Sequence, residues 1–173
     1  MTFRRATAAD AQNLAALAIQ VWLHTYATDG IRSAISQYVL SAFTAETFLR
    51  QIHDPSSQLH VAEVNAHLVA YAVVKFDAAC PTDNTGNVEL ATLYVQEHFA
   101  RAGLGSKLLA LGLGLARERG AGSRLWLTVN AQNAHALAFY RKHGFVQAGT
   151  TQFSFGGESH LNHVLLEPCA GFS

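Results

Sequence analysis

The organisation of this chain follows from residues 95–105, which read Val95-Gln96-Glu97-His98-Phe99-Ala100-Arg101-Ala102-Gly103-Leu104-Gly105. The strand-like run LATLYV (residues 90–95) leads into this segment, and a leucine-rich stretch with helical spacing follows it. Glycines let a backbone come close to a ligand, and the first amides of a helix lie unpaired at the positive end of its dipole. The segment therefore predicts a strand, a loop and a helix whose start can bind an anion.

A second segment, Asn133-x-x-Ala136-x-x-x-Tyr140-x-Lys142-x-Gly144-Phe145, follows about thirty residues later. Its helical spacing places Ala136 and Tyr140 on one face. A tyrosine on the apolar face of a helix is commonly a core residue with a satisfied hydroxyl, and an asparagine at a helix start commonly serves as its cap. A functional role for either residue needs a second line of argument.

Composition restricts the class of protein. A chain of 173 residues, half of them apolar, predicts a single domain over residues 1–173. Twelve basic and twelve acidic residues balance, so we expect neither a nucleic acid nor a membrane surface as partner. Cys80 and Cys169 fit no metal or disulfide spacing, which predicts free thiols and a cytoplasmic location. The amino terminus lacks the features of a signal peptide, and the longest apolar run is too short to span a bilayer.

The order of elements changes along the chain. The first third, after a short strand at Thr2–Arg5, is mostly helical, and Thr7 with Asp10 reads as a helix start. Residues 58–64 and 67–76 predict an antiparallel hairpin that turns at Asn65-Ala66. The expected elements after the loop at 77–86 are a strand (87–95), a helix (103–119), a strand (123–129), a helix (133–143), a strand (145–150) and a last strand (161–166). This order predicts an α/β (α+β) fold with a mixed sheet, helices on both faces and a β-α-β-α-β carboxyl-terminal half.

Together the two segments resemble the acyl-CoA-binding and active-site motifs of the GNAT family of N-acetyltransferases. The loop resembles V-x-x-x-x-[RQ]-G-x-G-x-[GA], in register from Val95 to Gly105, with Ala100 at the Arg or Gln position and Arg101 at the first glycine position. The resemblance implies a mostly antiparallel, twisted GNAT-like sheet and acetyl-CoA as co-substrate. Its pyrophosphate would bind amides of the loop, and its pantetheine would pair with the strand before the loop. The cofactor-binding residues implied are Leu93, Tyr94, Val95, Ala100, Arg101, Ala102, Gly103, Leu104, Gly105, Ser106, Asn133 and Tyr140.

The same resemblance implies the catalytic residues. Tyr140 would protonate the departing thiolate, since a phenol can donate to a group whose reference pKa is about 8.5. An alkylamine arrives mostly protonated at neutral pH, so a base is needed, and Glu89 on the strand before the loop is the candidate. Glu89 can equally be a structural carboxylate at the rim. Another acidic position found in some relatives is Thr128 here. Transfer would be direct, in a ternary complex, with no covalent enzyme intermediate.

The acceptor side also follows from the resemblance. The resemblance places an acceptor pocket in the helical amino-terminal third, where Trp22, Tyr26 and Tyr38 could line it or belong to the core. The chain looks most like the bacterial branch with polyamine (spermidine/spermine) N-acetyltransferases, which favours a small-molecule primary amine. A protein N-terminal acetyltransferase and a non-catalytic acyl-CoA-binding sensor domain are the alternatives.

Two further expectations concern metals and assembly. His160 and His163 have metal-like spacing, yet on a strand they would point to opposite faces, so no metal is expected. An exposed closing strand could pair across a homodimer.

Overall fold

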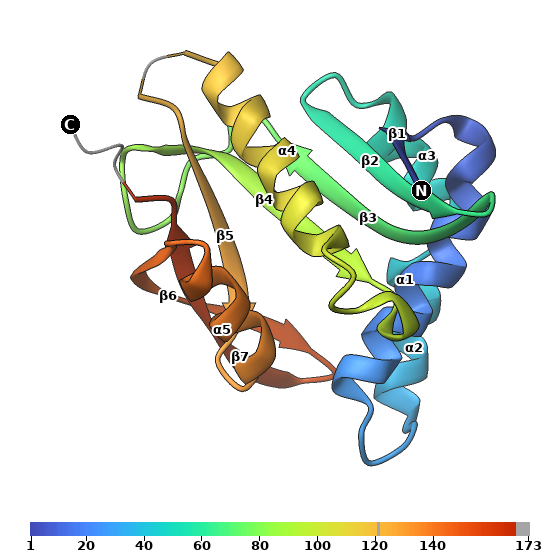
Figure 1. Ribbon diagram of the computed structural model, residues 1–173. Coiled ribbons are helices and arrows are strands. Elements are labelled where there is room, and N and C mark those ends of the chain that lie inside the picture. The colour runs from blue at the N-terminus through green and yellow to red at the C-terminus, as the bar shows by residue number, and fades with distance from the viewer. Residues whose placement is uncertain (121, 169–173) are drawn as a thin grey trace. The chain divides into compact units, whose positions relative to one another are not determined.

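The computed structural model of the protein describes residues 1–120 and 122–168. Its strands are β1 (Thr2–Arg5), β2 (Ser57–Val64), β3 (His67–Lys75), β4 (Gly86–Val95), β5 (Arg124–Asn130), β6 (Val146–Phe155) and β7 (Glu158–Leu166). In this part of the chain they follow the sheet order β1-β2-β3-β4-β5-β7-β6. The helices are α1 (Ala11–Tyr26), α2 (Ser33–Ala42), α3 (Ala45–His53), α4 (Leu104–Glu118) and α5 (Ala134–Lys142), with short 3-10 helices η1 (Ala8–Asp10) and η2 (Glu97–Phe99) (Figure 1).

The chain divides into two compact units. The first comprises Met1–Val74 and Thr92–Leu111, and the second comprises Lys75–Ala91 and Gly112 onward. β4 and α4 each contribute residues to both units. The mixed, mostly antiparallel sheet with helices and the β-α-β-α-β carboxyl-terminal half were predicted from the sequence and are confirmed.

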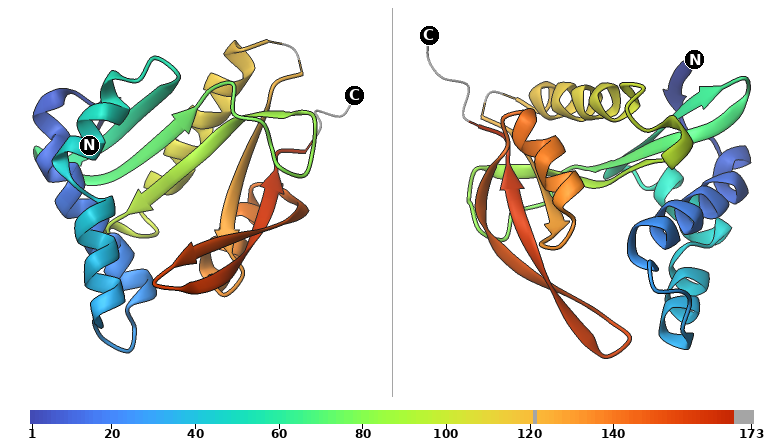
Figure 2. Two further views of the ribbon diagram at one scale, coloured as in Figure 1. Left: turned by 180° about the vertical axis from the view of Figure 1, so that it is seen from behind. Right: turned by 60° about the horizontal axis from the view of Figure 1, so that its bottom comes forward.

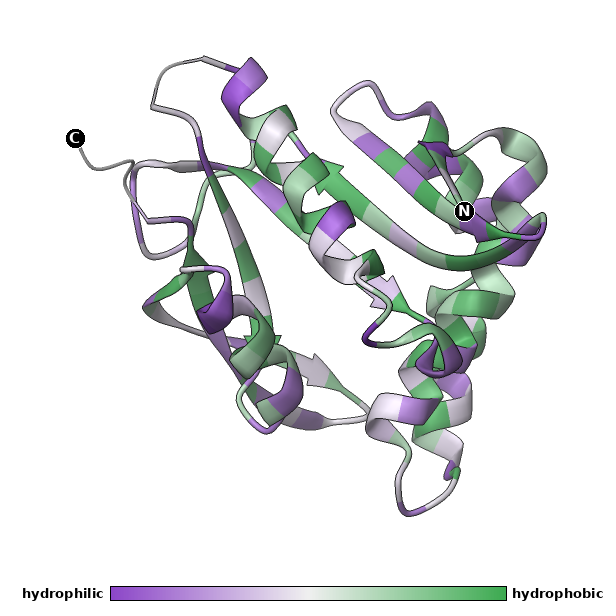
Figure 3. Cartoon of the chain, in the orientation of Figure 1, coloured by the Kyte–Doolittle hydropathy of each residue, from purple (hydrophilic) through white to green (hydrophobic). Residues whose placement is uncertain are grey.

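The first unit is built on apolar faces with regular spacing. Leu14, Ala18 and Trp22 are buried at i, i+4 and i+8 of α1, as its sequence periodicity predicts. β3 is buried from Val69 to Val74, and Figure 3 shows it as an almost continuous hydrophobic strand. The turn between β2 and β3 has positive φ at both Asn65 (51°) and Ala66 (62°), the conformation of a tight two-residue hairpin. The expected hairpin is therefore present.

A carboxylate network joins the start of the chain to β2. Asp10 is 6 % exposed, and its two oxygens accept hydrogen bonds from the Arg4 guanidinium, both at 2.8 Å. Asp10 also accepts from the Thr7 amide at 2.7 Å, and Arg4 reaches Glu63 of β2 at 2.5 Å. The predicted helix start at Thr7 and Asp10 is thus a 3-10 turn, and α1 itself begins at Ala11. Hydrogen bonds from Arg4 lower the pKa of Asp10 to about 2.

In the second unit, β5, β7 and β6 form an antiparallel ribbon beside the start of β4. β5 pairs with β7 from Trp126↔Leu166 to Asn130↔Asn162, and β7 continues to Glu158 against β6 (Figure 2). The sequence predicted strands at 145–150 and 161–166, so the predicted β6 ends five residues too early and the predicted β7 begins three residues too late. The exposed polar residues Gln152, Ser154 and Ser159 weakened the apolar signal, although they simply occupy the alternate, solvated positions of a longer hairpin.

The structure also bears on the expected free cysteines and on membrane-spanning helices. Cys80 is a buried free cysteine, whereas Cys169 lies outside the described residues. Within the described ranges, no helix is both long and apolar enough to cross a membrane.

The Asp10 network predicts a pH-dependent stability. The carboxyl of an unfolded chain titrates near 3.8 and that of the folded protein near 2, so its contribution is complete above about pH 4 and disappears as the pH falls toward 2. Asp10→Asn should lower the free energy of unfolding at neutral pH by about 1–3 kcal/mol, measured by urea denaturation. Asp77→Asn, which removes an exposed carboxylate paired with Arg119, is the matched control and should change little. An equal effect of Asp10→Asn at pH 7 and pH 2 would contradict the assignment.

Candidate active site

The loop after β4 has the backbone of an anion-binding turn. Arg101 has φ 65° and Gly103 has φ 78°, so two left-handed residues turn the chain from η2 into α4. Within the described residues, the backbone N–H groups of Gly103, Leu104 and Gly105 have no acceptor in the protein. They lie at the start of a helix of fifteen residues, where the dipole favours negative charge. The residues present therefore fit the pyrophosphate of coenzyme A.

The backbone conformation of Arg101 explains why the family pattern has glycine at this position. A left-handed residue is strained unless it is glycine, and here the strain is carried by an arginine whose side chain is exposed. Ala100, at the position expected for Arg or Gln, is extended, with φ –60° and ψ 150°. The departures from the family pattern thus change side chains while leaving the turn in place.

Contacts within the first unit fix where this loop begins. The Gln96 amide donates to the Val69 carbonyl at 2.9 Å, and the Gln96 side chain donates to Gln20 of α1 at 2.9 Å. The Glu97 carboxylate oxygen Oε2 lies 3.5 Å from Nε2 of His24 in α1. On the helix that follows, the Lys107 ammonium lies 5.4 Å from the centre of the Phe3 ring. Sequence reasoning missed these contacts, because each joins residues far apart in the chain.

The three predicted cofactor-binding residues of β4 lie directly before the loop. Leu93 and Val95 are half-buried. The Tyr94 ring packs edge-on against Tyr71, with 5.5 Å between ring centres, in the core of the first unit. The Tyr94 side chain therefore has a packing role, and only its backbone is suited to pairing with an extended ligand.

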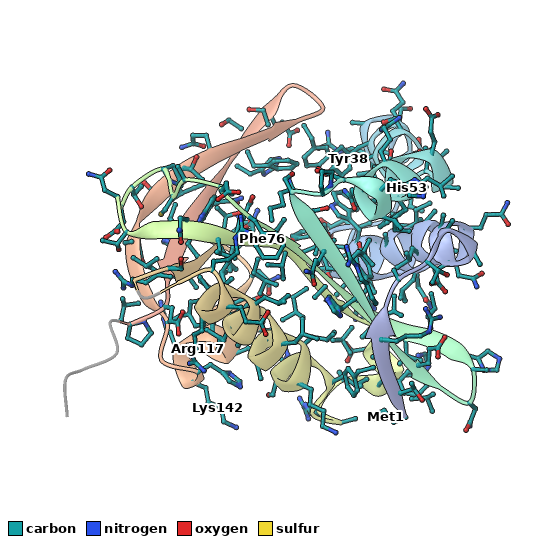
Figure 4. The ribbon with its side chains drawn as sticks, turned by 90° about the horizontal axis from the view of Figure 1, so that it is seen from above. Met1, Tyr38, His53, Phe76, Arg117 and Lys142 are labelled. Atoms are coloured by element: carbon teal, nitrogen blue, oxygen red, sulfur yellow. The ribbon has the colours of Figure 1, made fainter. Side chains whose placement is uncertain are left out.

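The predicted acceptor aromatics also lie in the first unit and are in contact with one another. The Trp22 ring centre is 5.1 Å from both the Tyr26 and the Tyr38 ring centres. Trp22 is buried and Tyr26 is 40 % exposed. Tyr38 is labelled in Figure 4, and burial raises the pKa of its hydroxyl above the ordinary value. α1 and α2 thus form an aromatic cluster with one buried and one exposed edge.

Glu89 belongs to the second unit and is half-buried on β4. It lies in register with Trp126 of β5, and its neighbours in the chain, Val88 and Leu90, are buried. Burial raises the pKa of its carboxyl, and Lys75 partly opposes that rise. A carboxylate kept partly out of water without a hydrogen bond that offsets its burial is suited to take up a proton.

The pairing of β4 with β5 is short. Within the second unit it runs from Gly86↔Arg124 to Glu89↔Trp126, whereas β5 continues to Asn130. Beyond Trp126, no further pair joins β5 to the part of β4 that belongs to the second unit.

Tyr140 and Asn133 are both positioned by α5 in the second unit. Asn133 caps the helix, since its side chain accepts from the Ala136 amide at 3.0 Å. Tyr140 is 7 % exposed, and its ring packs 5.1 Å from Phe139 and 5.8 Å from Phe145, measured between ring centres. The sequence allowed both of these structural roles, the helix cap for Asn133 and the buried ring for Tyr140. The Asn133 side-chain NH2 and the Tyr140 hydroxyl are the atoms of these two residues that can contact a ligand.

His160 and His163 do not form a metal site with each other. They oppose Phe153 and Thr150 of β6, and this odd spacing along β7 places them on opposite faces, as the sequence indicates. The described part of the chain contains no group of three or more His, Cys, Asp or Glu side chains that could hold a metal ion.

Comparisons with known proteins assign the chain to a family. The model of the acetyltransferase (GNAT) family matches residues 21–145. An uncharacterized N-acetyltransferase of Mycobacterium tuberculosis is 27% identical over 91% of this chain and 96% of its own length. A mycothiol acetyltransferase of Clavibacter sepedonicus is 38% identical over 55% of this chain and 29% of its own. The crystal structure of PaiA N-acetyltransferase from Thermoplasma acidophilum in complex with coenzyme A has a TM-score of 0.78 at 20% identity and covers 96% of this chain and 97% of that one.

The chain therefore belongs to the GNAT family of acetyltransferases. Its class as an N-acetyltransferase and the expectation of acetyl-CoA as co-substrate are confirmed at the level of the family. The comparisons do not distinguish the polyamine branch from others.

The loop geometry predicts how Gly103 contributes to binding. Gly103→Ala should weaken coenzyme A binding by roughly tenfold in calorimetry, because a left-handed alanine is strained and displaces the amides. Gly157→Ala is a matched control, since Gly157 has φ 79° and equally open space around its Cβ position, but lies in the β6–β7 turn. Both variants should lose similar stability, and only Gly103→Ala should lose affinity. Equal affinities for coenzyme A in the two variants would place the pyrophosphate elsewhere.

We expect Glu89→Gln to lower the enzyme activity without lowering the stability of the fold. Because its folded pKa lies above the unfolded value, ionisation of Glu89 works against the folded state, so Glu89→Gln should not lower the free energy of unfolding at neutral pH. A base must be ionised, so wild-type kcat/KM should fall as the pH drops through the raised pKa, and Glu89→Gln should remove that limb together with most of the activity. Glu46→Gln, at an exposed carboxylate of α3, is the control and should alter neither. A wild-type pH profile in Glu89→Gln would exclude Glu89 as the base.

Proposed function

We propose that this protein transfers acetyl from acetyl-CoA to the primary amine of a small molecule, directly and in a ternary complex. The observation that carries the proposal is the turn before α4, where left-handed Arg101 and Gly103 leave the first amides of the helix open to an anion. Because backbone amides form this anion-binding site, the site tolerates alanine at position 100. The family match extends from residue 21 to residue 145 and thus includes parts of both units. This supports residues 1–173 acting as a single acetyltransferase domain.

The co-substrate, when bound, supplies the acetyl group as an activated thioester. The open amides of Gly103, Leu104 and Gly105 hold the pyrophosphate, and the backbone of Leu93 and Val95 pairs with the pantetheine. The side-chain NH2 of Asn133 contacts the same ligand, because its Oδ1 already serves the helix cap. Arg101 adds a cation near the phosphates from an exposed position.

Two side chains of the second unit move protons. Glu89 takes a proton from the incoming ammonium through water, and its half-buried position supports that role. Tyr140 donates its phenolic proton to the departing thiolate. The cluster of Trp22, Tyr26 and Tyr38 contacts the acceptor through its exposed edge. A small-molecule acceptor is also favoured by the relative named mycothiol acetyltransferase, which is named for a small molecule.

The test is a thiol-release screen with acetyl-CoA against polyamines, amino acids, aminoglycosides and short peptides. We expect turnover with small amines, and Tyr140→Phe should lower kcat about tenfold or more while the dissociation constant of coenzyme A stays unchanged. Acetylation of peptide amino termini alone would identify a protein N-terminal acetyltransferase. Tight coenzyme A binding without turnover of any amine would identify a sensor domain.

A further inference from the structure

A surface cavity of about 470 Å³ lies within the first unit, between α1 and the turn of the β2–β3 hairpin (Figure 1). Its described lining contains no residue with a proposed role in acetyl transfer. Asn13, Leu17 and Gln20 follow one another at helical spacing along α1, and residues 66–68 form the hairpin side. A cavity of this volume can hold a small organic molecule.

Three side chains of the cavity keep hydrogen-bonding groups available. His67 Nδ1 lies 2.7 Å from the Asn65 carbonyl, which can only accept, so Nδ1 carries the proton and Nε2 of the neutral ring is an acceptor. Gln20 Oε1 accepts from Gln96, which leaves the Gln20 NH2 as a donor. Within residues 1–120 and 122–168, the Asn13 side chain has no hydrogen-bond partner. The cavity therefore offers donors on α1 and an acceptor on β3.

The absence of charge in the lining selects the class of ligand. Among the described residues, no Asp, Glu, Lys or Arg lines the cavity, while Leu17 is buried and Leu68 is half-buried. An ammonium or a carboxylate would lose water here without gaining a counter-charge. A secondary amide matches the groups present, because its carbonyl can accept from the NH2 of Gln20 or Asn13 and its N–H can donate to His67 Nε2. Its alkyl chain can lie on the two leucines.

Gln20 links this cavity to the anion-binding turn before α4. Gln96 Nε2 donates to Gln20 Oε1 at 2.9 Å, and the Gln96 amide donates to the Val69 carbonyl at 2.9 Å. η2 follows Gln96 directly, and the left-handed residues Arg101 and Gly103 follow η2. A ligand that accepts from the Gln20 NH2 holds this side chain in the orientation that binds Gln96. Occupancy of the cavity therefore favours the conformation of the turn that binds coenzyme A.

We propose that this cavity is an effector site for the N-acetylated product, a neutral secondary amide. Acetylation converts an amine that is mostly protonated at neutral pH, with a reference pKa of about 10, into an amide without charge. The cavity thus distinguishes the product from the substrate by charge. Because the bound amide tightens the binding of coenzyme A, it slows the release of the second product and inhibits turnover. This inference rests on the proposed acetyl transfer.

The test uses N-hexylacetamide as the probe and hexylamine as its charged control. In nuclear magnetic resonance, the side-chain NH2 signals of Asn13 and Gln20 should shift and saturate with N-hexylacetamide and stay in place with hexylamine. Calorimetry should show that coenzyme A binds about fivefold more tightly to the protein saturated with N-hexylacetamide. Because coupling between two sites is reciprocal, coenzyme A should tighten the binding of the probe by the same factor.

Three variants separate binding in the cavity from its effect on the turn. Gln20→Leu removes the NH2 donor, so the affinity for the probe should fall about fivefold or more and the effect on coenzyme A should disappear. Gln96→Leu breaks only the link, so the probe should still shift the Asn13 and Gln20 signals while the affinity for coenzyme A no longer responds to it. Gln37→Leu, at an exposed glutamine of α2, is the matched control and should keep both properties.

The outcomes that contradict the effector site differ from those that contradict acetyl transfer. A probe that leaves the Asn13 and Gln20 signals in place, or an effect on coenzyme A that persists in Gln20→Leu and Gln96→Leu, would place the amide in the acceptor pocket instead. Equal shifts with hexylamine would overturn selection by charge. All of these are binding measurements, so they are independent of turnover. Coenzyme A binding with no amine acetylated would overturn acetyl transfer, and with it the assignment of the amide as product.

Discussion

The left-handed backbone at residues 101 and 103 is the constraint on which the proposed chemistry depends. It ends η2, starts α4 and leaves the amides of Gly103, Leu104 and Gly105 open at the positive end of a fifteen-residue helix. The hydrogen bonds of Gln96 to Val69 and Gln20 hold the start of the same turn against the first unit. A binding site made from backbone in this way is insensitive to side-chain replacement, which explains how Ala100 and Arg101 can stand where the family pattern has other residues.

The two units divide the expected tasks. The first carries the anion-binding turn and the aromatic cluster of α1 and α2. The second carries Glu89 and the α5 residues Asn133 and Tyr140. Glu89 is partly withdrawn from water, and its burial raises the pKa of its carboxyl. Natural proteins keep such groups where a ligand supplies the missing partner.

Local chemistry explains what the sequence could predict. The bounds of α3, from Ala45 to His53, follow from the Thr44 cap and the Asp54-Pro55 stop, and the hairpin turn follows from Asn65 between two β-rich runs. The loop and the carboxyl-terminal order of elements followed from glycine spacing and changes of period. The length of β6 and β7 was underestimated because solvated alternate residues resemble a loop.

Features that depend on distant residues could not be predicted. The Arg4–Asp10–Glu63 network requires β1 to pair with β2, and a left-handed Arg101 contradicts the preference of long side chains. For the catalytic candidates, the sequence supplied the residue types and the structure supplied their burial.

The central claim is that the amides at the start of α4 bind the pyrophosphate of coenzyme A. The most direct measurement follows the backbone N–H signals of Gly103, Leu104 and Gly105 by nuclear magnetic resonance during titration with coenzyme A and, separately, with pantetheine. We expect large, saturable shifts of these three signals with coenzyme A and small ones with pantetheine, which lacks the pyrophosphate. Saturating coenzyme A that shifts other amides and leaves these three in place would contradict it.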